Sequence, residues 1–371
     1  MTTEVSISET PLGETGRTWF APVLAHGTLV CASNLDTRMA FLQAGGFEFP
    51  LTVNDEEWEN SWFCSPWTHY ISYAREEIAR AVASPLAMVA GAAFGAIGTW
   101  FRRAELNRAV MVNNWLHSTN PWPAWSGREL ESALAALRER WPDHAVIFRS
   151  LNTRECPDLL VALRSAGARL VPSRQVWYYE PDSAEVSASE EFRKDVRLLQ
   201  RGDLKIVPHE ALAPDDFNRL TELYTQLYIR KYSGHNPRYT ADWLRHLHSK
   251  GLAKFTALRE AESGFVGVEA CCELHGVLTS PIVGYDLGKP RSLGLYRRLA
   301  VIPLLEARAR NLPLNLSSGV GRFKALRGGK PEMEYLAVFD AHLPARRRRP
   351  WRMIEELSKR LLAPYTVRHG L

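Results

Sequence analysis

Two carboxylates stand where a side chain could take up or release a proton during a reaction. Glu269 lies inside the apolar run FVGVEACC, so its charge must face a pocket or a partner if that run is a buried strand. Asp286 closes the next predicted strand, directly after Tyr285. A carboxylate can act as a general base and a tyrosine hydroxyl as a proton donor. Two plainer interpretations stay open: Glu269 on the exposed face of a half-buried strand, and Asp286 as a turn former before Gly288 and Pro290.

A second set of polar side chains follows a predicted strand in the first half of the chain. Its members, together with two residues of the neighbouring predicted strand, are Asn113, Asn114, Trp115, Ser118, Thr119, Asn120, Arg149 and Asn152. Such a group can bind a polar substrate or the amides of a pantetheine arm. Short polar side chains equally often satisfy the backbone groups of a loop. We therefore expect either a ligand site or a self-contained loop at this strand end.

Basic side chains mark two further places in the second half. Lys324 and Arg327 are three residues apart on one predicted helical face, which suits a phosphate or carboxylate as well as a solvated basic helix. Four consecutive arginines at 346–349 form either a solvated face or a docking site for a polyanion. Neither HExxH nor a Cys/His ligand pattern occurs, so the sequence predicts no metal site.

Alternating strands and helices must position these residues, and the same order occurs twice. The first run has predicted strands 109–114, 145–152 and 174–180 with helices 128–141 and 157–167. The second has predicted strands 279–286, 312–317 and 333–343, with a helix capped by Ser292 and another at 319–329. A helix at 215–232 and antiparallel strands precede this second run. The repetition predicts a duplicated α/β domain, and one larger irregular α/β sheet is the alternative.

Length and composition indicate a soluble protein of two or three domains. The 371 residues (42.0 kDa) are too many for one ordinary core, and 46% hydrophobic with 23% charged residues excludes a disordered chain, a collagen-like fibre and a coiled coil. The polar stretch 181–190 predicts a linker between domains at 1–180 and 191–371. A net charge of +5 permits anionic partners without demanding them. Five cysteines without a C-x-x-C pair, and a start unlike a signal peptide, favour reduced thiols and a cytoplasmic protein.

The uncharged segment 81–101 is long enough to span a bilayer. Ten of its residues are Ala or Gly, and Pro85 interrupts it, so we expect a buried or partly mobile helix. A membrane contact is the alternative, since a lipid-like substrate would need such a surface.

Four stretches of the second half carry a family resemblance. Residues 192–207, 229–240 (IRKYSGHNPRYT), 284–299 and 315–344 resemble the GNAT N-acyltransferase superfamily, and its FemAB-like branch in particular. The first half resembles it through element order and the run NNWLHSTNPWP. The resemblance implies two tandem GNAT-like domains, each a mixed sheet flanked by helices. It also implies an enzyme that moves an acyl or aminoacyl group to an amine.

The same resemblance implies a donor site and catalytic roles. In GNAT enzymes the turn before the helix that follows the fourth strand binds the coenzyme A pyrophosphate. The matching residues here are Arg291, Ser292 and Gly294, while Tyr296 stands where a small residue is usual. Lys231 lies in the shared IRKYSGHNP stretch. We expect Glu269 or Asp286 to act as the base and Tyr285 to protonate the leaving thiol, with no covalent enzyme intermediate.

Three functions follow as hypotheses. The first is an N-acyltransferase that uses an acyl-CoA or acyl carrier protein thioester and a small-molecule amine. The second is an aminoacyl-tRNA-dependent, FemX-like transferase, which the basic charge favours weakly. The third is a binding protein with a degenerate GNAT fold, which the imperfect turn at 291–296 favours.

Overall fold

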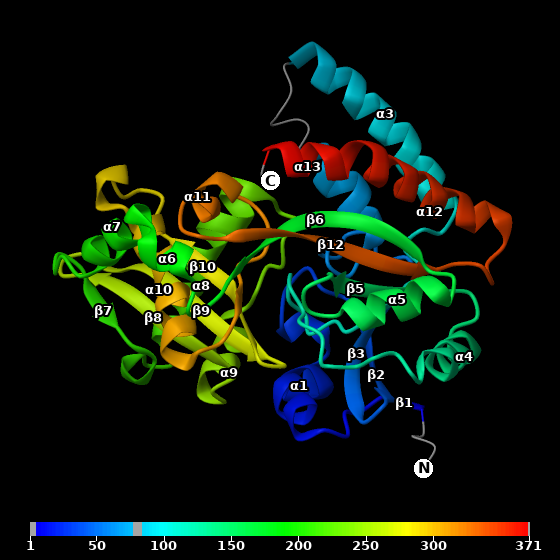
Figure 1. Cartoon of the computed structure of the whole chain (residues 1–371), viewed down its shortest axis with the longest axis horizontal. Coiled ribbons are helices and arrows are strands. Elements are labelled where there is room, and N and C mark those ends of the chain that lie inside the picture. Colours follow the sequence, from blue (N-terminus) through cyan, green and yellow to red (C-terminus); the bar gives the residue numbers. More distant parts are fainter. Residues whose placement is uncertain (1–4, 77–83, 370–371) are drawn as a thin grey trace. The chain divides into compact units, whose positions relative to one another are not determined.

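The computed structural model describes residues 5–76 and 84–369 as a mixed α/β protein (Figure 1). The chain forms two compact units, and each takes residues from distant parts of the sequence. Unit 1 consists of Met1–Ser173, Ser233–Arg238 and Tyr335–Ala363, and unit 2 of Arg174–Tyr232, Tyr239–Glu334 and Pro364–Leu371.

The sheet of unit 1 mixes antiparallel and parallel strands. Strands β2 and β3 form an antiparallel hairpin, β3 pairs antiparallel with β4, and β4 pairs parallel with β5. The order is β1-β2-β3-β4-β5, followed by the unit 1 parts of β12 and β6. The bounds are β1 (Ser6–Ser8), β2 (Arg38–Ala44), β3 (Phe47–Asn54), β4 (Ala109–Val112), β5 (Ala145–Leu151), β6 (Arg169–Tyr179) and β12 (Lys330–Phe339).

Helices cover both faces of this sheet because its central strands are apolar on both sides. Val146 and Phe148 pack toward α4 and α5, while Ile147 packs with Phe101 of α3 and Trp351 of α12. Ile71 of the π-helical turn η2 packs in the same hydrophobic cluster as Phe101, Ile147 and Trp351. The helical bounds are α1 (Glu14–His26), η1 (Thr28–Val30), η2 (Thr68–Tyr73), α3 (Ser84–Arg103), α4 (Leu130–Arg140), α5 (Pro157–Ser165), α12 (Ala345–Leu357) and η6 (Ser358–Leu362).

Unit 2 contains an antiparallel meander that continues into a parallel crossover. Its order is β7-β8-β9-β10-β11, followed by the unit 2 parts of β6 and β12. Strands β7 to β10 pair antiparallel, whereas β10 and β11 pair parallel. The bounds are β7 (Lys205–Val207), β8 (Ala253–Glu260), β9 (Gly264–Leu274), β10 (Val277–Tyr285) and β11 (Leu314–Asn315).

Two helix layers enclose the sheet of unit 2. On one face, Phe192 of α7 and Leu299 of α10 pack with Leu278. On the other face, α8 lies against β9 and β10, and the rings of Phe217 and Phe255 are 5.2 Å apart. The bounds are α6 (Ala184–Ala188), α7 (Glu190–Leu199), η3 (His209–Ala211), α8 (Asp216–Tyr224), η4 (Thr225–Tyr232), α9 (Ala241–Ser249), η5 (Arg291–Leu293), α10 (Leu295–Arg310), α11 (Gly321–Ala325) and α13 (Ala363–His369).

The predicted fold class, two α/β units that each contain a mixed sheet flanked by helices, is confirmed. The order helix, antiparallel strands, then a strand–helix–strand crossover is also present in unit 2. The borders of the compact units differ from the predicted ones, because β6 and β12 each contribute residues to both units. The stretch 181–190 is not a bare linker: it holds α6, which Ser183 caps, and Val186 of α6 is buried.

The alanine- and glycine-rich segment 81–101 falls mostly within α3; residues 81–83 lie outside the described part of the chain. Among the described helices, none combines the length and the apolar character that crossing a membrane requires.

Candidate functional site

The sheet of unit 2 opens where β10 and β11 part. Their parallel ladder joins Leu278 to Leu314 and Thr279 to Asn315, where β11 ends. An irregularity in the β9–β10 register then follows between Thr279 and Ile282, and β10 continues along β9 to Tyr285. A bulge of this kind bends a strand and redirects its side chains. Ligands of α/β sheets collect at such points beyond the ends of parallel strands.

Aromatic side chains from separate elements meet at the end of β10. The rings of Tyr285 and Tyr296 are 6.3 Å apart, and Tyr296 lies 5.0 Å from Phe323 of α11. On η4, the rings of Tyr228 and Tyr232 are 6.0 Å apart. Burial, with the neighbouring tyrosines, raises the pKa of Tyr296. Burial also raises the pKa of Tyr232, against the opposing effect of the nearby Lys231 ammonium.

Lys231 links η4 to the end of β10. Its Nζ lies 3.2 Å from the Tyr285 hydroxyl oxygen and 5.6 Å from the centre of that ring. The predicted residues Lys231 and Tyr285 are therefore in direct contact. An ammonium at this distance stabilises negative charge on a phenol oxygen, so the pair can donate a proton and hold the resulting anion.

Asp286 has partners that fix it in place. Its Oδ2 accepts a hydrogen bond from the Arg219 guanidinium at 2.7 Å, and its Oδ1 accepts one from the backbone N–H of Gly288 at 2.9 Å. The second contact is that of a turn former, which was the plainer interpretation of this residue. The first makes Asp286 half of an ion pair with Arg219.

Glu269 is buried, with 1% of its surface exposed, and lies on β9 opposite Val283 of β10. Its Oε1 accepts hydrogen bonds from Ser280 Oγ at 2.8 Å and Cys271 Sγ at 3.1 Å. Burial raises the pKa of this carboxyl to about 8. The interpretation of Glu269 as a solvent-exposed residue is wrong, because both faces of β9 are covered by helices. Ser280 is half-buried at the irregularity of β10, so its hydroxyl connects the buried carboxyl to that opening.

The turn before α10 is exposed to solvent. Arg291 and Ser292 are exposed in the short turn η5, and Gly294 follows with φ 61°. The predicted cap is wrong in one respect: α10 begins at Leu295 with Gly294 at the N-cap, and Ser292 lies one turn earlier. Glycine suits this position because the backbone is left-handed there, and a Cβ would force the Leu198 side chain, 2.7 Å away, to shift. The first N–H groups of α10 have no acceptor within the helix, which suits an anion.

Lys324 and Arg327 are buried rather than on a solvated helical face, so that interpretation is wrong. Lys324 Nζ donates to the carbonyl oxygens of Leu316, Ser317 and Ser318 at 2.7 to 3.1 Å. Burial, with nearby Arg174, lowers its pKa to about 7.

Arg327 Nε donates to Asp195 Oδ2 at 2.6 Å, and its guanidinium stacks 3.3 Å from the centre of the Phe323 ring. Both basic residues therefore hold α11 and the loop after β11 in place. A phosphate-binding role for them stays a prediction.

The polar group predicted in the first half forms a buried network in unit 1. Asn114 Oδ1 accepts a hydrogen bond from Arg149 at 2.8 Å, and Asn114 Nδ2 donates to Thr52 Oγ1 at 2.8 Å. Asn120 Oδ1 accepts from the backbone N–H of Trp115 at 2.9 Å.

The other members of this group lie alongside. The Asn113 side-chain amide donates to the Asn120 carbonyl oxygen and accepts a hydrogen bond from the Trp115 indole N–H. The Ser118 carbonyl oxygen accepts one from Arg149, and Thr119 is buried. The Asn152 side-chain oxygen accepts hydrogen bonds from the backbone N–H groups of Arg154 and Glu155. These contacts give the group the self-contained loop role, one of the two expected. Ligand binding by its members remains a prediction.

Sequence reasoning missed Tyr228, Tyr232, Phe323, Ser280 and Arg219. The signal for the first two was the spacing of aromatic residues at positions 224, 228 and 232, one helical turn apart. Ser280 could not be found, because its contact with Glu269 depends on the register irregularity. Among the described residues, no three His, Cys, Asp or Glu side chains are grouped so that they could hold a metal ion.

The chain is similar to known proteins in its structure only. No family model and no curated protein matches the sequence. The similar solved structures include GNAT-fold proteins. A tandem GNAT protein from the clavulanic acid biosynthesis pathway is 10% identical, with 91% of this chain and 98% of that chain covered and a TM-score of 0.43.

Two further likenesses cover a smaller share of the chain. FemX is 10% identical, with 62% of this chain and 80% of that chain covered (TM-score 0.47). L-PGS from Bacillus licheniformis is 15% identical, with 62% and 76% covered (TM-score 0.45). With identities this low and TM-scores below 0.5, these likenesses carry no argument about activity. The description of the fold therefore rests on the strand order and element order given above.

Proposed function

We propose that unit 2 is an N-acyltransferase that moves an acyl group from a thioester to an amine where β10 and β11 part. One observation carries the proposal: the divergence of these parallel strands, with the contact between Tyr285 and Lys231 at its edge. A carbonyl placed beside that edge would have a proton donor within reach. The neighbouring N-terminus of α10 would bind the phosphates of the donor.

The chain supplies a base and an acid for this transfer. The amine nitrogen attacks the thioester carbonyl, a C–N bond forms and the C–S bond breaks. The proton lost by the amine passes through Ser280 to the Glu269 carboxylate, and Tyr285 protonates the leaving thiolate with Lys231 stabilising the phenolate. A pKa of about 8 suits Glu269 to this role, because a base works best with a pKa near the working pH.

Of the two predicted bases, Glu269 has the stronger support. Asp286 is engaged by Arg219 and by the Gly288 N–H, so a proton taken up there would disrupt an ion pair. Asp286 then serves to hold the turn after Tyr285. The five cysteines Cys31, Cys64, Cys156, Cys271 and Cys272 are all buried, which supports direct transfer without an acyl-cysteine intermediate.

A thioester donor is favoured over an aminoacyl-tRNA because part of the arginine run has a structural role. Arg347 is buried and its guanidinium lies 3.2 Å from Glu105, which Arg346 also contacts at 3.3 Å. These two arginines are therefore partly neutralised. Arg291, Ser292 and Gly294 are proposed to contact the phosphates that coenzyme A and the phosphopantetheine of an acyl carrier protein share.

The test is release of free thiol from acyl-CoA donors of increasing chain length and from acyl-loaded carrier protein, each with a mixture of amines. We expect thiol release that depends on both donor and amine. A parallel reaction with charged tRNA distinguishes the donor class. Transfer from tRNA alone would replace the thioester in this proposal, and transfer from none of the donors would support a binding protein instead.

A further inference from the structure

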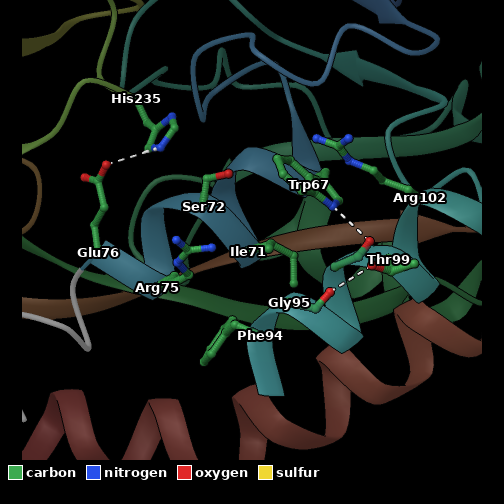
Figure 2. Close-up of a pocket in the computed structure, with 11 residues that line it drawn as sticks. Trp67, Ile71, Ser72, Arg75, Glu76, Phe94, Gly95, Thr99, Arg102 and His235 are labelled. Atoms are coloured by element: carbon green, nitrogen blue, oxygen red, sulfur yellow. Dashed lines mark hydrogen bonds and ion pairs between the residues drawn. The ribbon is translucent and has the colours of Figure 1, made fainter. Parts of the chain in front are cut away.

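A separate cavity of about 320 Å³ lies within unit 1, between η2 and α3 (Figure 2). The residues around it come from η2 and the turn that follows, from the second half of α3, and from the inserted segment 233–238. π-Helical turns such as η2 are frequent at functional sites. This volume lies at the lower end of the range of about 300–1,000 Å³ that is typical of small-molecule sites, so it is enough for a small organic ligand.

Positive charge dominates the polar part of this cavity. Arg75 and Arg102 both line it, and within residues 5–76 and 84–369 neither is paired with a carboxylate. The Arg102 guanidinium stacks on two indoles, 4.2 Å from the ring centre of Trp67 and 5.3 Å from that of Trp58. Such stacking holds a guanidinium in place while its N–H groups stay available to a ligand.

Glu76 is the one acidic side chain among the described residues that line the cavity, and it contacts a histidine. Glu76 Oε1 lies 3.3 Å from His235 Nε2, at one end of the cavity in Figure 2. The lining therefore holds two guanidinium groups against one carboxylate, which leaves a net positive charge. The electrostatic balance of the cavity favours an anion.

Most of the rest of the wall is apolar, with Ser72 and Thr99 as its hydroxyl-bearing side chains. Ile71 and Phe94 face the cavity, and Gly95 leaves it open, since a Cβ there would meet no atom within 4 Å. Two polar groups of the wall are satisfied within the protein: Trp67 Nε1 donates to the Gly98 carbonyl at 3.2 Å, and Thr99 Oγ1 to the Gly95 carbonyl at 3.0 Å. A ligand must therefore bring an apolar body to this side of the cavity.

We propose that the cavity binds an organic anion with a compact apolar body, such as a medium-chain or aryl carboxylate. Arg75 and Arg102 hold the anionic group, and the Ile71, Phe94 and Gly95 side receives the apolar part. The proposal uses residues of unit 1 alone, so it stands or falls independently of the acyl transfer proposed for unit 2.

Calorimetric titration of the full chain with three probes tests this proposal. Decanoate and naphthalene-2-carboxylate represent the chain and aryl sources of the same chemistry, and decylamine has the same chain with the opposite charge. We expect at least one carboxylate to bind with a Kd on the order of 100 µM or tighter, and decylamine to bind at least about tenfold more weakly. Arg75→Gln and Arg102→Gln should each weaken carboxylate binding by about fivefold or more.

A matched pair of glycine variants separates filling of the cavity from damage to the fold. Gly95→Leu places a side chain in the cavity and should abolish binding, while Gly91→Leu, one turn earlier on α3 and outside the lining, should preserve it. Both changes raise helix propensity, and circular dichroism checks that both variants fold. Equal affinity for decylamine, unchanged binding by folded Gly95→Leu, or binding of neither carboxylate would overturn the proposal.

Discussion

At the scale of single residues, the buried carboxyl of Glu269 makes a prediction about stability. Burial raises its folded-state pKa to about 8, whereas an unfolded chain has a glutamate pKa of about 4.3. Between these two values the folded protein holds a proton that the unfolded chain has lost. The free energy of unfolding therefore decreases as the pH rises through this window, by up to roughly 1.4 kcal/mol per pH unit.

Glu269→Gln should remove this dependence, because its amide stays neutral at every pH. Melting temperatures of wild type and variant are to be compared at pH 5.5, 7 and 8.5. We expect the melting temperature of Glu269→Gln to rise relative to that of wild type as the pH increases. The control Ser280→Ala leaves the carboxyl in place, so its melting temperature should depend on pH as that of wild type does. Parallel melting curves for wild type and Glu269→Gln at all three values would show that Glu269 ionises normally.

Sequence reasoning recognised some residues of the candidate site and not others, for physical reasons. Glu269 was recognisable because a charge inside an apolar strand must be accommodated somewhere. The burial of the Lys324 ammonium was not recognisable in the sequence. Its three acceptors are backbone carbonyl oxygens of a loop, and the sequence does not specify the path of that loop. Asn114 and Arg149 were singled out as candidate ligand-binding residues, but their contact with each other follows from the pairing of β4 with β5, which the sequence does not specify.

At the scale of elements, Gly284 determines how closely α8 can approach β10. A Cβ at this position would lie 2.3 Å from the backbone nitrogen of Tyr224 and 2.5 Å from the carbonyl carbon of Leu223. These are backbone atoms that no rotamer change can move. Gly284→Ala should therefore push α8 away and lower the free energy of unfolding by about 1–3 kcal/mol or more.

Denaturant titration measures this loss, and Gly95→Ala is the control. A Cβ at Gly95 would meet no atom within 4 Å, and alanine favours the helix, so this variant should be as stable as wild type or up to about 1 kcal/mol more stable. A Gly284→Ala variant with the wild-type midpoint would mean that α8 and β10 are not packed as described.

Element types followed from the sequence better than element ends. The apolar runs at 109–114 and 145–152 became β4 and β5, and the helix at 157–167 became α5. Strand β11 is only two residues long, although six were predicted, because its neighbour β10 diverges after Thr279. Divergence of this kind is set by the register of the whole sheet, which local periodicity does not encode.

At the scale of the whole molecule, strand sharing predicts how fragments behave. Tyr178 and Tyr179 of β6 pair with β11, although β6 precedes the stretch 181–190. Likewise, residues of β12 pair with β5 of unit 1. We expect separately expressed fragments 1–180 and 191–371 to be insoluble or unfolded, because each lacks a strand of its own sheet. Co-expression should restore folded protein, detected by co-purification and circular dichroism, whereas two independently folded fragments would contradict this account.

The mixed α/β organisation was predictable because strands and helices alternate along both halves of the sequence. The division of β6 and β12 between the two compact units was not predictable, because nothing in the local sequence of either strand marks the residue at which one unit ends.

The most direct test of the central claim is mass-spectrometric detection of N-acylated amine formed by wild type, Tyr285→Phe and Tyr365→Phe. All three are supplied with the donor and amine that the thiol-release screen selects. Tyr365 lies on α13 with half of its surface exposed, so its variant is a matched control for loss of one phenol hydroxyl. We predict product from wild type and from Tyr365→Phe at equal rates, and a rate at least about 100-fold lower for a normally folded Tyr285→Phe. Equal rates for all three proteins would contradict acyl transfer at the end of β10.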